Sequence, residues 1–170
     1  MRYNMVFGAF AMIKIRIVAV GRVKEKYFSE AVSEYSKRLS RFCDFSLVEV
    51  KEENYDKATA ANVEIILSVE GERIEKAIKG TPVCLAIEGK KLSSEGLAEF
   101  IKTKIDRGEG EITFIIGGSS SCGLSARVKR AADRRISFSD MTFPHTLARV
   151  MLSEQIYRAF TIINGAEYHK

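Results

Sequence analysis

The chain has 170 residues, which is enough for one compact domain but too few for two. Hydrophobic residues make up 46% and charged residues 29% of it, so the composition excludes an intrinsically disordered chain and suits a globular protein with a packed core. The formal net charge of +5 and the pI of about 9.1 permit an anionic partner such as RNA without requiring one.

The first segment, residues 1–11, contains a short apolar stretch that ends in Ala9, Phe10 and Ala11. This ending mimics a signal-peptidase site, but the apolar part is too short for the core of a signal peptide, which spans roughly 7–15 residues. The segment also runs directly into the apolar residues 13–20. We therefore expect either a disordered extension or a natural start at Met12, with a single domain over residues 12–170.

From residue 13 onward, apolar runs rich in β-branched residues alternate with longer helical segments. The runs predict five strands, at residues 13–20, 45–50, 82–87, 111–116 and 135–138. The segments between and after them predict five helices, at residues 27–40, 62–79, 94–107, 124–132 and 145–163. This alternation predicts an α/β fold, with a single mostly parallel sheet that carries helices on both faces.

The last predicted helix is apolar on two sides. At 100° per residue, Leu147, Val150 and Met151 share one side, while Ile156 and Phe160 lie almost opposite with Ile163. One side would pack on the sheet, and we expect the other to be covered by a second copy of the chain, although a central helix wrapped by its own chain is the alternative. Glu154 and Arg158, on the first side, have the spacing of a structural ion pair.

The cysteines and the hydropathy pattern bear on metals, redox state and membranes. Cys43, Cys84 and Cys122 are far apart, so their spacing predicts neither a zinc site nor a disulfide framework and suits a reducing cytoplasm. Cys84 lies in an apolar run and is expected to be core packing. No apolar run approaches the ~18 residues that cross a membrane.

Three predicted loops follow strands, and ligands of open α/β sheets bind beyond the carboxyl ends of strands. The loops span residues 87–95, 115–124 and 138–145. Gly89 in the first loop and Gly117 with Gly118 in the second allow a close approach of the backbone. The third interleaves apolar and polar groups, which suits a purine ring and a thioether. The alternative interpretations are a solvated lysine pair for the first loop, a generic glycine turn for the second and a well-packed connection for the third. No P-loop or GxGxxG signature is present.

Several motifs together resemble one known family. They are the runs at residues 17–27, 92–98, 114–118, 137–145 and 154–160, Leu85 with Gly89 and Lys90, and the end at 168–170. Over residues 12–170 the chain resembles the ribosomal RNA large subunit methyltransferase H family, which are SPOUT enzymes. The resemblance implies S-adenosylmethionine as cofactor, a C-terminal trefoil knot, and a homodimer with active sites near its interface. The implied reaction is N3-methylation of a pseudouridine in a 23S rRNA stem-loop on assembled ribosomes.

The same resemblance implies roles for individual residues. Those that would line the cofactor site are Leu85, Gly117, Phe138, Ser139, Asp140, Met141, Thr142 and Phe143. Those expected near the RNA base, with catalytic roles, are His145, Arg149, Tyr168 and His169. Of these, His169 or His145 has the chemistry of a base that removes the N3 proton near neutral pH. One departure is the glycine loop, where four residues, 119–122, stand in place of two.

A basic set is expected to contact RNA phosphates. Its members are Lys90, Lys91, Arg127, Lys129, Arg130, Arg134 and Arg135. Without the resemblance, a solvated helix face would be the preferred interpretation of these charges.

Two rival functions stay open on the sequence alone. A non-catalytic ribosome-binding factor on the same fold would keep the basic set and need no cofactor. A flavodoxin-like nucleotide-binding enzyme would fit the alternation of elements, but the missing phosphate-binding signature argues against it.

Overall fold

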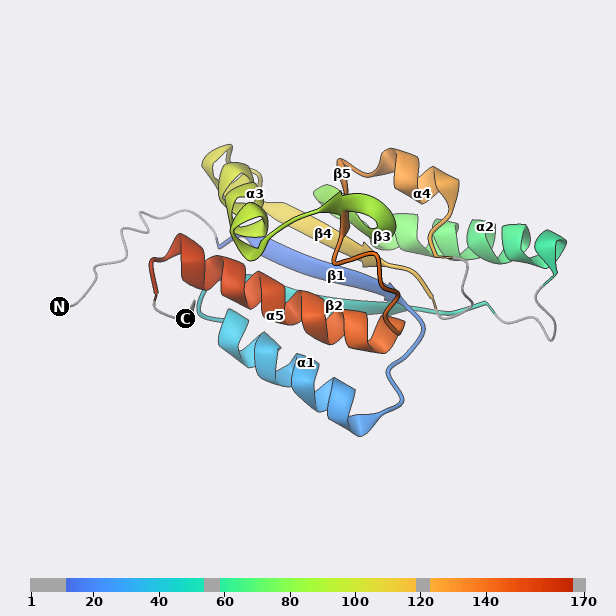
Figure 1. The fold of residues 1–170 in the computed structure, drawn as a ribbon, viewed down its shortest axis with the longest axis horizontal. Coiled ribbons are helices and arrows are strands. Elements are labelled where there is room, and N and C mark those ends of the chain that lie inside the picture. Colours follow the sequence, from blue (N-terminus) through green and yellow to red (C-terminus); the bar gives the residue numbers. More distant parts are fainter. Residues whose placement is uncertain (1–11, 54–58, 119–122, 167–170) are drawn as a thin grey trace.

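The computed structural model describes residues 12–53, 59–118 and 123–166 (Figure 1). The prediction for residues 1–11 lies outside these ranges. Strands and helices alternate as predicted. In chain order they are β1 (Lys14–Val20), α1 (Lys26–Leu39), β2 (Asp44–Val50), α2 (Ala60–Ala77), β3 (Thr81–Lys91), α3 (Ser94–Asp106), β4 (Glu111–Ile116), α4 (Ala126–Ala131), β5 (Arg134–Ser137) and α5 (His145–Ile163).

The strands form one sheet in the order β2-β1-β4-β3-β5. Every pairing in it is parallel, so Lys14 of β1 stands beside Asp44 of β2 and Glu111 of β4. Because all strands run the same way, their carboxyl ends meet at one edge of the sheet. The predicted α/β class with a parallel sheet is confirmed.

The prediction that the strand gives way to a loop at residue 87 is wrong for residues 88–91, which belong to β3. This strand curves around β5, so that Ile136 pairs with both Leu85 and Lys90. A Cβ at Gly89 would lie 2.5 Å from the carbonyl carbon of Ile136. The close approach that Gly89 allows is therefore to a neighbouring strand, which the apolar pattern alone did not indicate.

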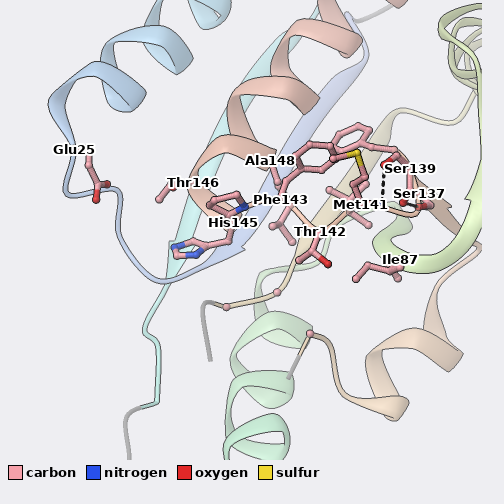
Figure 2. Close-up of a pocket in the computed structure, with 18 residues that line it drawn as sticks. Glu25, Ile87, Ser137, Ser139, Met141, Thr142, Phe143, His145, Thr146 and Ala148 are labelled. Carbon is pink, nitrogen blue, oxygen red and sulfur yellow. Dashed lines mark hydrogen bonds between the residues drawn. The ribbon is translucent and has the colours of Figure 1, made fainter. Parts of the chain in front are cut away.

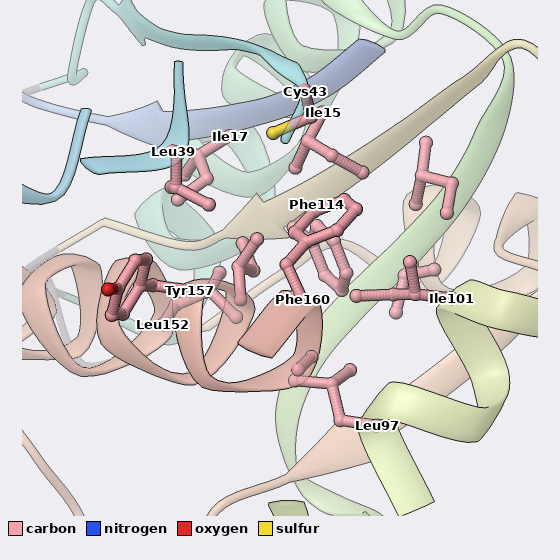
Figure 3. Packing of buried hydrophobic residues seen from close by; sticks show 14 of the residues in the cluster. Ile15, Ile17, Leu39, Cys43, Leu97, Ile101, Phe114, Leu152, Tyr157 and Phe160 are labelled. Atoms are coloured by element: carbon pink, nitrogen blue, oxygen red, sulfur yellow. The ribbon is translucent and has the colours of Figure 1, made fainter. Parts of the chain in front are cut away.

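Helices cover both faces of the sheet, as predicted (Figure 1). On one face, α1, α3 and α5 pack over the larger core, where Leu39, Ile101 and Leu152 surround the sheet residues Ile17 and Phe114 (Figure 3). The other face carries α2 and α4, in a smaller core built from Val18, Val20, Ile74, Cys84, Ile115, Leu124 and Val128. Cys84 is fully buried there, as expected for core packing.

Helix α5 lies across the larger core, and its two apolar sides have different surroundings. Ile156 and Phe160 are buried against the sheet, whereas Leu147, Val150 and Met151 keep part of their surface exposed. The predicted ion pair is confirmed: Arg158 Nη2 lies 2.9 Å from Glu154 Oε1. None of the described helices is both long and apolar enough to cross a membrane.

Candidate active site at the carboxyl edge of the sheet

A cavity of about 650 Å³ opens where β4 and β5 end and α5 begins, beside the middle of β3 (Figure 2). This volume is within the range of small-molecule sites, roughly 300–1,000 Å³. Seven residues predicted to hold a cofactor line it, together with His145: Leu85, Gly117, Phe138, Ser139, Met141, Thr142 and Phe143. The lining residues that the structure describes include no lysine or arginine, so the cavity offers no cationic side chain to a phosphate.

Glycine backbone forms one wall of the cavity. A Cβ at Gly117 would stand 2.4 Å from the carbonyl oxygen of Gly123, and one at Gly118 would stand 2.9 Å from Val20 Cγ1. Gly123 has a φ of +68°, which L side chains rarely adopt. Side chains are therefore excluded where the chain leaves β4, and backbone N–H and C=O groups can reach a ligand directly. The longer insertion at 119–122 lies outside the described residues.

The segment that joins β5 to α5 supplies the opposite wall. Ser137 Oγ donates a hydrogen bond to the carbonyl oxygen of Ser139 at 2.9 Å, and the N–H of Met141 donates to Ser139 Oγ at 2.8 Å. These bonds hold the turn, and Figure 2 shows Met141, Phe143 and Thr142 grouped beside the cavity. The wall therefore mixes apolar groups with hydroxyls, as the sequence predicted for a ligand loop.

Asp140 differs from its neighbours in this segment. It was expected at the cofactor, but it is not among the residues that line the cavity. Its carboxylate is exposed and forms an ion pair with Lys91 at the end of β3. The structure thus gives Asp140 a place on the surface of the turn and keeps anionic charge out of this side of the cavity.

His145 begins α5 at the rim of the cavity. A Cβ at Gly21 would lie 3.7 Å from His145 Nε2 and 3.3 Å from Glu52 Oε2, which places imidazole, carboxylate and backbone together. Burial and then the charge of Arg149 lower the pKa of His145, against smaller opposing effects of Glu52 and Glu25. At neutral pH the imidazole is therefore mainly uncharged, the state in which it can accept a proton.

Arg149 lies one turn further along α5 and has no exposed surface. Its Nη1 donates to Glu49 Oε1 at 2.8 Å, and its Nη2 donates to the carbonyl oxygens of Val20 at 2.7 Å and Gly21 at 2.9 Å. The guanidinium thus ties α5 to the carboxyl ends of β1 and β2. In this arrangement it is placed to position the rim of the cavity, not to touch a substrate.

Comparison with known proteins agrees with this geometry. The family model described as "Predicted SPOUT methyltransferase" matches residues 13–169. Two proteins named "Ribosomal RNA large subunit methyltransferase H", from Streptococcus pyogenes serotype M5 (strain Manfredo) and Limosilactobacillus reuteri (strain DSM 20016), are 46% and 48% identical over 161 residues. These alignments cover 93% of this chain and 100% of each relative. The chain belongs to the SPOUT methyltransferase family.

Two solved structures resemble the fold of this chain. A probable methyltransferase from Bordetella pertussis Tohama I has a TM-score of 0.52 at 9% identity, with 89% of this chain and 97% of that chain covered. A probable methylase family protein from Haemophilus influenzae Rd KW20 has a TM-score of 0.50 at 14% identity, over 93% and 68% of the two chains. At such identities the likeness bears on the fold alone.

The basic residues of this SPOUT methyltransferase that were expected to contact RNA are partly engaged within the chain. Arg127 and Lys129 pair with Glu75 and Glu88, each at 2.6 Å. Lys91 pairs with Asp140, and the guanidinium of Arg134 lies 4.7 Å from the centroid of the Phe100 ring. The remaining members, Lys90, Arg130 and Arg135, are exposed. Tyr168 and His169, expected near the RNA base, lie outside the described residues.

The three predicted ligand loops also contain Ile87, Ile116, Gly118, Gly123 and Pro144, which line the cavity. Sequence reasoning missed Glu25, Ala86, Ser137, Thr146 and Ala148. Ala86, Ser137 and Thr146 each adjoin a residue that was assigned to the site, so extending each motif by one position would have found them. Glu25 is different, because only the position of β1 beside β4 brings the loop after β1 to this edge.

Proposed function

We propose that this chain methylates N3 of a pseudouridine in 23S rRNA on assembled ribosomes, with S-adenosylmethionine as the methyl donor. The observation that carries the proposal is the cavity at the carboxyl edge, built from the loops that the family resemblance assigned to the cofactor. Membership of the SPOUT methyltransferase family and the names of the full-length relatives support the reaction class and the RNA substrate. The reaction would take place in the cytoplasm, where ribosomes are found.

The cavity fits this cofactor in three respects. Leu85, Phe138 and Phe143 offer apolar surface for an adenine ring. The glycine wall offers backbone groups for the ribose and the amino acid part, where a Cβ at Gly117 would collide with Gly123. A ligand without phosphates needs no lysine or arginine, and the described lining has none. When bound, S-adenosylmethionine supplies an electrophilic methyl group.

The protein's own residues would then align the base and remove a proton. N3 of pseudouridine carries a hydrogen, which must leave as the new N–C bond forms. His145 is uncharged near neutral pH and stands at the rim, so its imidazole can accept this proton. His169 is the other candidate base, and Tyr168 would stack on or hydrogen-bond to the target nucleotide. Closure of the site against water would assist alignment.

We further propose that the curved end of β3 and the short β5 form a trefoil knot. The support is the double pairing of Ile136 with Leu85 and Lys90, which places β5 inside a bend of β3. Knots are rare in proteins, and neither periodicity nor hydropathy predicts one. The family resemblance is the origin of this proposal.

The partly exposed side of α5 supports a homodimer. Val150 and Met151, together with Leu92 and Leu97, line a second hollow of about 500 Å³ beside the paired Glu154. We propose that a second copy covers this side, as the family resemblance implies. Val150→Lys would then give monomers in analytical ultracentrifugation, whereas wild-type protein would sediment as a dimer.

Methylation of ribosomes that lack the modification tests the proposed function. Purified protein, labelled S-adenosylmethionine and such ribosomes should yield label in 23S rRNA, and mapping should place it on N3 of a pseudouridine. Cofactor binding without transfer to any ribosomal RNA would favour the non-catalytic ribosome-binding factor. Label on another atom would contradict the assigned reaction.

A further inference from the structure

The loop between β1 and α1 is a basic surface that the proposed reaction has not used. Arg22 and Lys24 are exposed, and within the described ranges neither forms an ion pair. Lys26 forms only an exposed pair with Glu30, at 3.5 Å. Tyr27, at the start of α1, leaves 64% of its surface exposed. The exposed ring offers a stacking surface next to these cations.

This loop lies beside the candidate active site. It leaves β1 next to His145, since a Cβ at Gly21 would be 3.7 Å from His145 Nε2. Figure 2 shows the chain pass beside the imidazole and reach Glu25 before α1 begins. Glu25 lines the cavity itself. Arg22, Lys24 and Tyr27 therefore stand at the rim, on the side away from the β5–α5 wall.

The loop is also held in place. The N–H of Gly21 donates to the carbonyl oxygen of Val50 at 2.9 Å, and Arg149 donates to the carbonyl oxygen of Gly21 at the same distance. Glu49 Oε1 accepts from the N–H of Val23 at 2.9 Å and from Arg149 Nη1 at 2.8 Å. One buried arginine and one carboxylate thus fix the loop to the helix that carries His145. A preorganised surface loses less conformational entropy when a partner binds.

The cations here differ from several members of the basic set on α4, β3 and β5. Arg127, Lys129 and Lys91 are in ion pairs, so an RNA phosphate would have to displace a carboxylate from each of them. A phosphate can bind Arg22 or Lys24 without displacing a carboxylate, because neither forms an ion pair within the described residues. The exposed Tyr27 in the first turn of α1 adds a flat surface on which a nucleobase can stack.

We propose that Arg22, Lys24 and Tyr27 form an RNA-binding rim, at which the two cations contact phosphates and the tyrosine ring stacks on a base next to the target nucleotide. The inference rests on the proposed function and adds a substrate contact to it. Single-stranded loops expose unstacked bases, and proteins recognise these by aromatic stacking together with phosphate contacts. A stem-loop is therefore the form of RNA that this rim fits.

Two rim variants test the inference in the full-length protein. They are the double variant Arg22→Ala with Lys24→Ala, and Tyr27→Ala. The matched control is Lys14→Ala with Lys79→Ala, which removes the same charge from two exposed residues at the opposite edge of the sheet. Tyr27→Phe keeps the ring and serves as the aromatic control. Each protein is titrated calorimetrically with S-adenosylmethionine and assayed for methyl transfer to unmodified ribosomes over a range of salt concentrations.

Both rim variants should bind S-adenosylmethionine as wild type does, while KM for ribosomes rises by about tenfold for the lost stacking or phosphate contacts. The double variant should also reduce the slope of log KM against log salt by about two. Tyr27→Phe and the amino-edge control should stay within about twofold of wild type, since each keeps every proposed contact.

Unchanged KM in both rim variants, with an active wild type, would overturn the rim and leave the proposed function intact. Failure of the wild type to bind the donor or to methylate ribosomes would instead reject the proposed function. If the rim variants lose affinity for ribosomes but bind protein-free 23S rRNA as wild type does, with the same salt slope, the rim contacts a ribosomal protein and the inference is wrong.

Discussion

The two edges of the parallel sheet differ in how their charged and small residues are used. At the amino edge the buried and half-buried cations have partners within the chain: Lys104 lies 3.1 Å from Glu109 and 3.3 Å from Asp133, and Arg16 pairs with Glu111 at 3.0 Å. At the carboxyl edge a cavity of about 650 Å³ opens among glycines, with Arg149 as the buried cation behind its rim.

This difference separates stability from function in one domain. Groups that already have partners have little left to offer a ligand, so the amino edge is expected to matter for folding. At the carboxyl edge, backbone and side-chain groups face an open space, and the structural interactions lie one layer below it. Substitutions at the two edges should therefore have different consequences even where their local chemistry is alike.

The largest difference is expected between the two buried cations. Arg149→Met leaves Glu49 without its cationic partner and removes the donor to the carbonyl oxygens of Val20 and Gly21, which should cost about 3–5 kcal/mol of unfolding free energy. Lys104→Met should cost only about 1 kcal/mol, because Glu109 and Asp133 remain solvated. Urea denaturation measures both, and methyl transfer should fall only for Arg149→Met. Equal losses of stability would contradict the separation of the edges.

His145 provides the next largest effect. If it is the base, His145→Gln should lower kcat by about 100-fold or more. The pKa of His145 is below its ordinary value of 6.5 because of burial, so wild-type kcat should be constant above that pH and fall below it. Folding stability should change with pH in the same direction as kcat. The stability that the buried neutral imidazole contributes is present above pH 6.5 and is lost as the pH falls through the lowered pKa.

A pH profile of kcat for wild type, His145→Gln and His169→Gln separates the two candidate bases. Loss of the acid limb in His145→Gln identifies His145. If that limb persists in His145→Gln and is lost in His169→Gln, the base is in the tail.

Two glycines give a matched pair of smaller effect. A Cβ would lie 2.0 Å from Glu111 O at Gly80 and 2.4 Å from Gly123 O at Gly117. Alanine at either position should destabilise the fold by about 2 kcal/mol through overpacking. Only Gly117→Ala should also weaken binding of S-adenosylmethionine. Calorimetric titration of the folded protein with this ligand measures the affinity. Weakened binding in Gly80→Ala would show that the amino edge is coupled to the cavity.

The smallest effect is expected at Asp140. Its carboxylate pairs with Lys91 on the surface, and exposed pairs contribute about 0–1 kcal/mol. Asp140→Asn should therefore change the free energy of unfolding by less than about 1 kcal/mol. It should change the affinity for S-adenosylmethionine by less than about twofold. A tenfold loss of affinity would restore the cofactor role that the sequence suggested for this carboxylate.

The sequence predicted most of the fold because its signals are local. β-branched runs identified the strands, and the predicted bounds 145–163 of the last helix match α5. The path of β3 past Ile87 was missed, since Gly89 and the lysines after it are typical of a loop. Their strand conformation depends on pairing with Ile136, a contact between distant parts of the chain.

The residues of the candidate site also differ in whether local sequence signals or contacts between distant parts of the chain place them. Residues in the loops after β4 and β5, such as Gly117 and Phe143, could be predicted because the carboxyl ends of parallel strands meet at one edge. Leu85 lies within β3 and was assigned through the family resemblance. Glu25 and the buried network of Arg149 and Glu49 could not, since strand order and helix packing bring them together. The direction in which Asp140 points depends on one turn and on Lys91, which no motif specifies.

Calorimetric titration with S-adenosylmethionine tests most directly whether the carboxyl-edge cavity holds the methyl donor. Wild type and Lys104→Met should bind S-adenosylmethionine with the same affinity. Met141→Arg should bind it at least about tenfold more weakly, because the bound ligand would cover the new charge at the cavity wall and remove its water. Met141 is 71% exposed, so this substitution leaves the core unchanged. The absence of binding to folded wild-type protein, or equal affinities for all three proteins, would contradict the account.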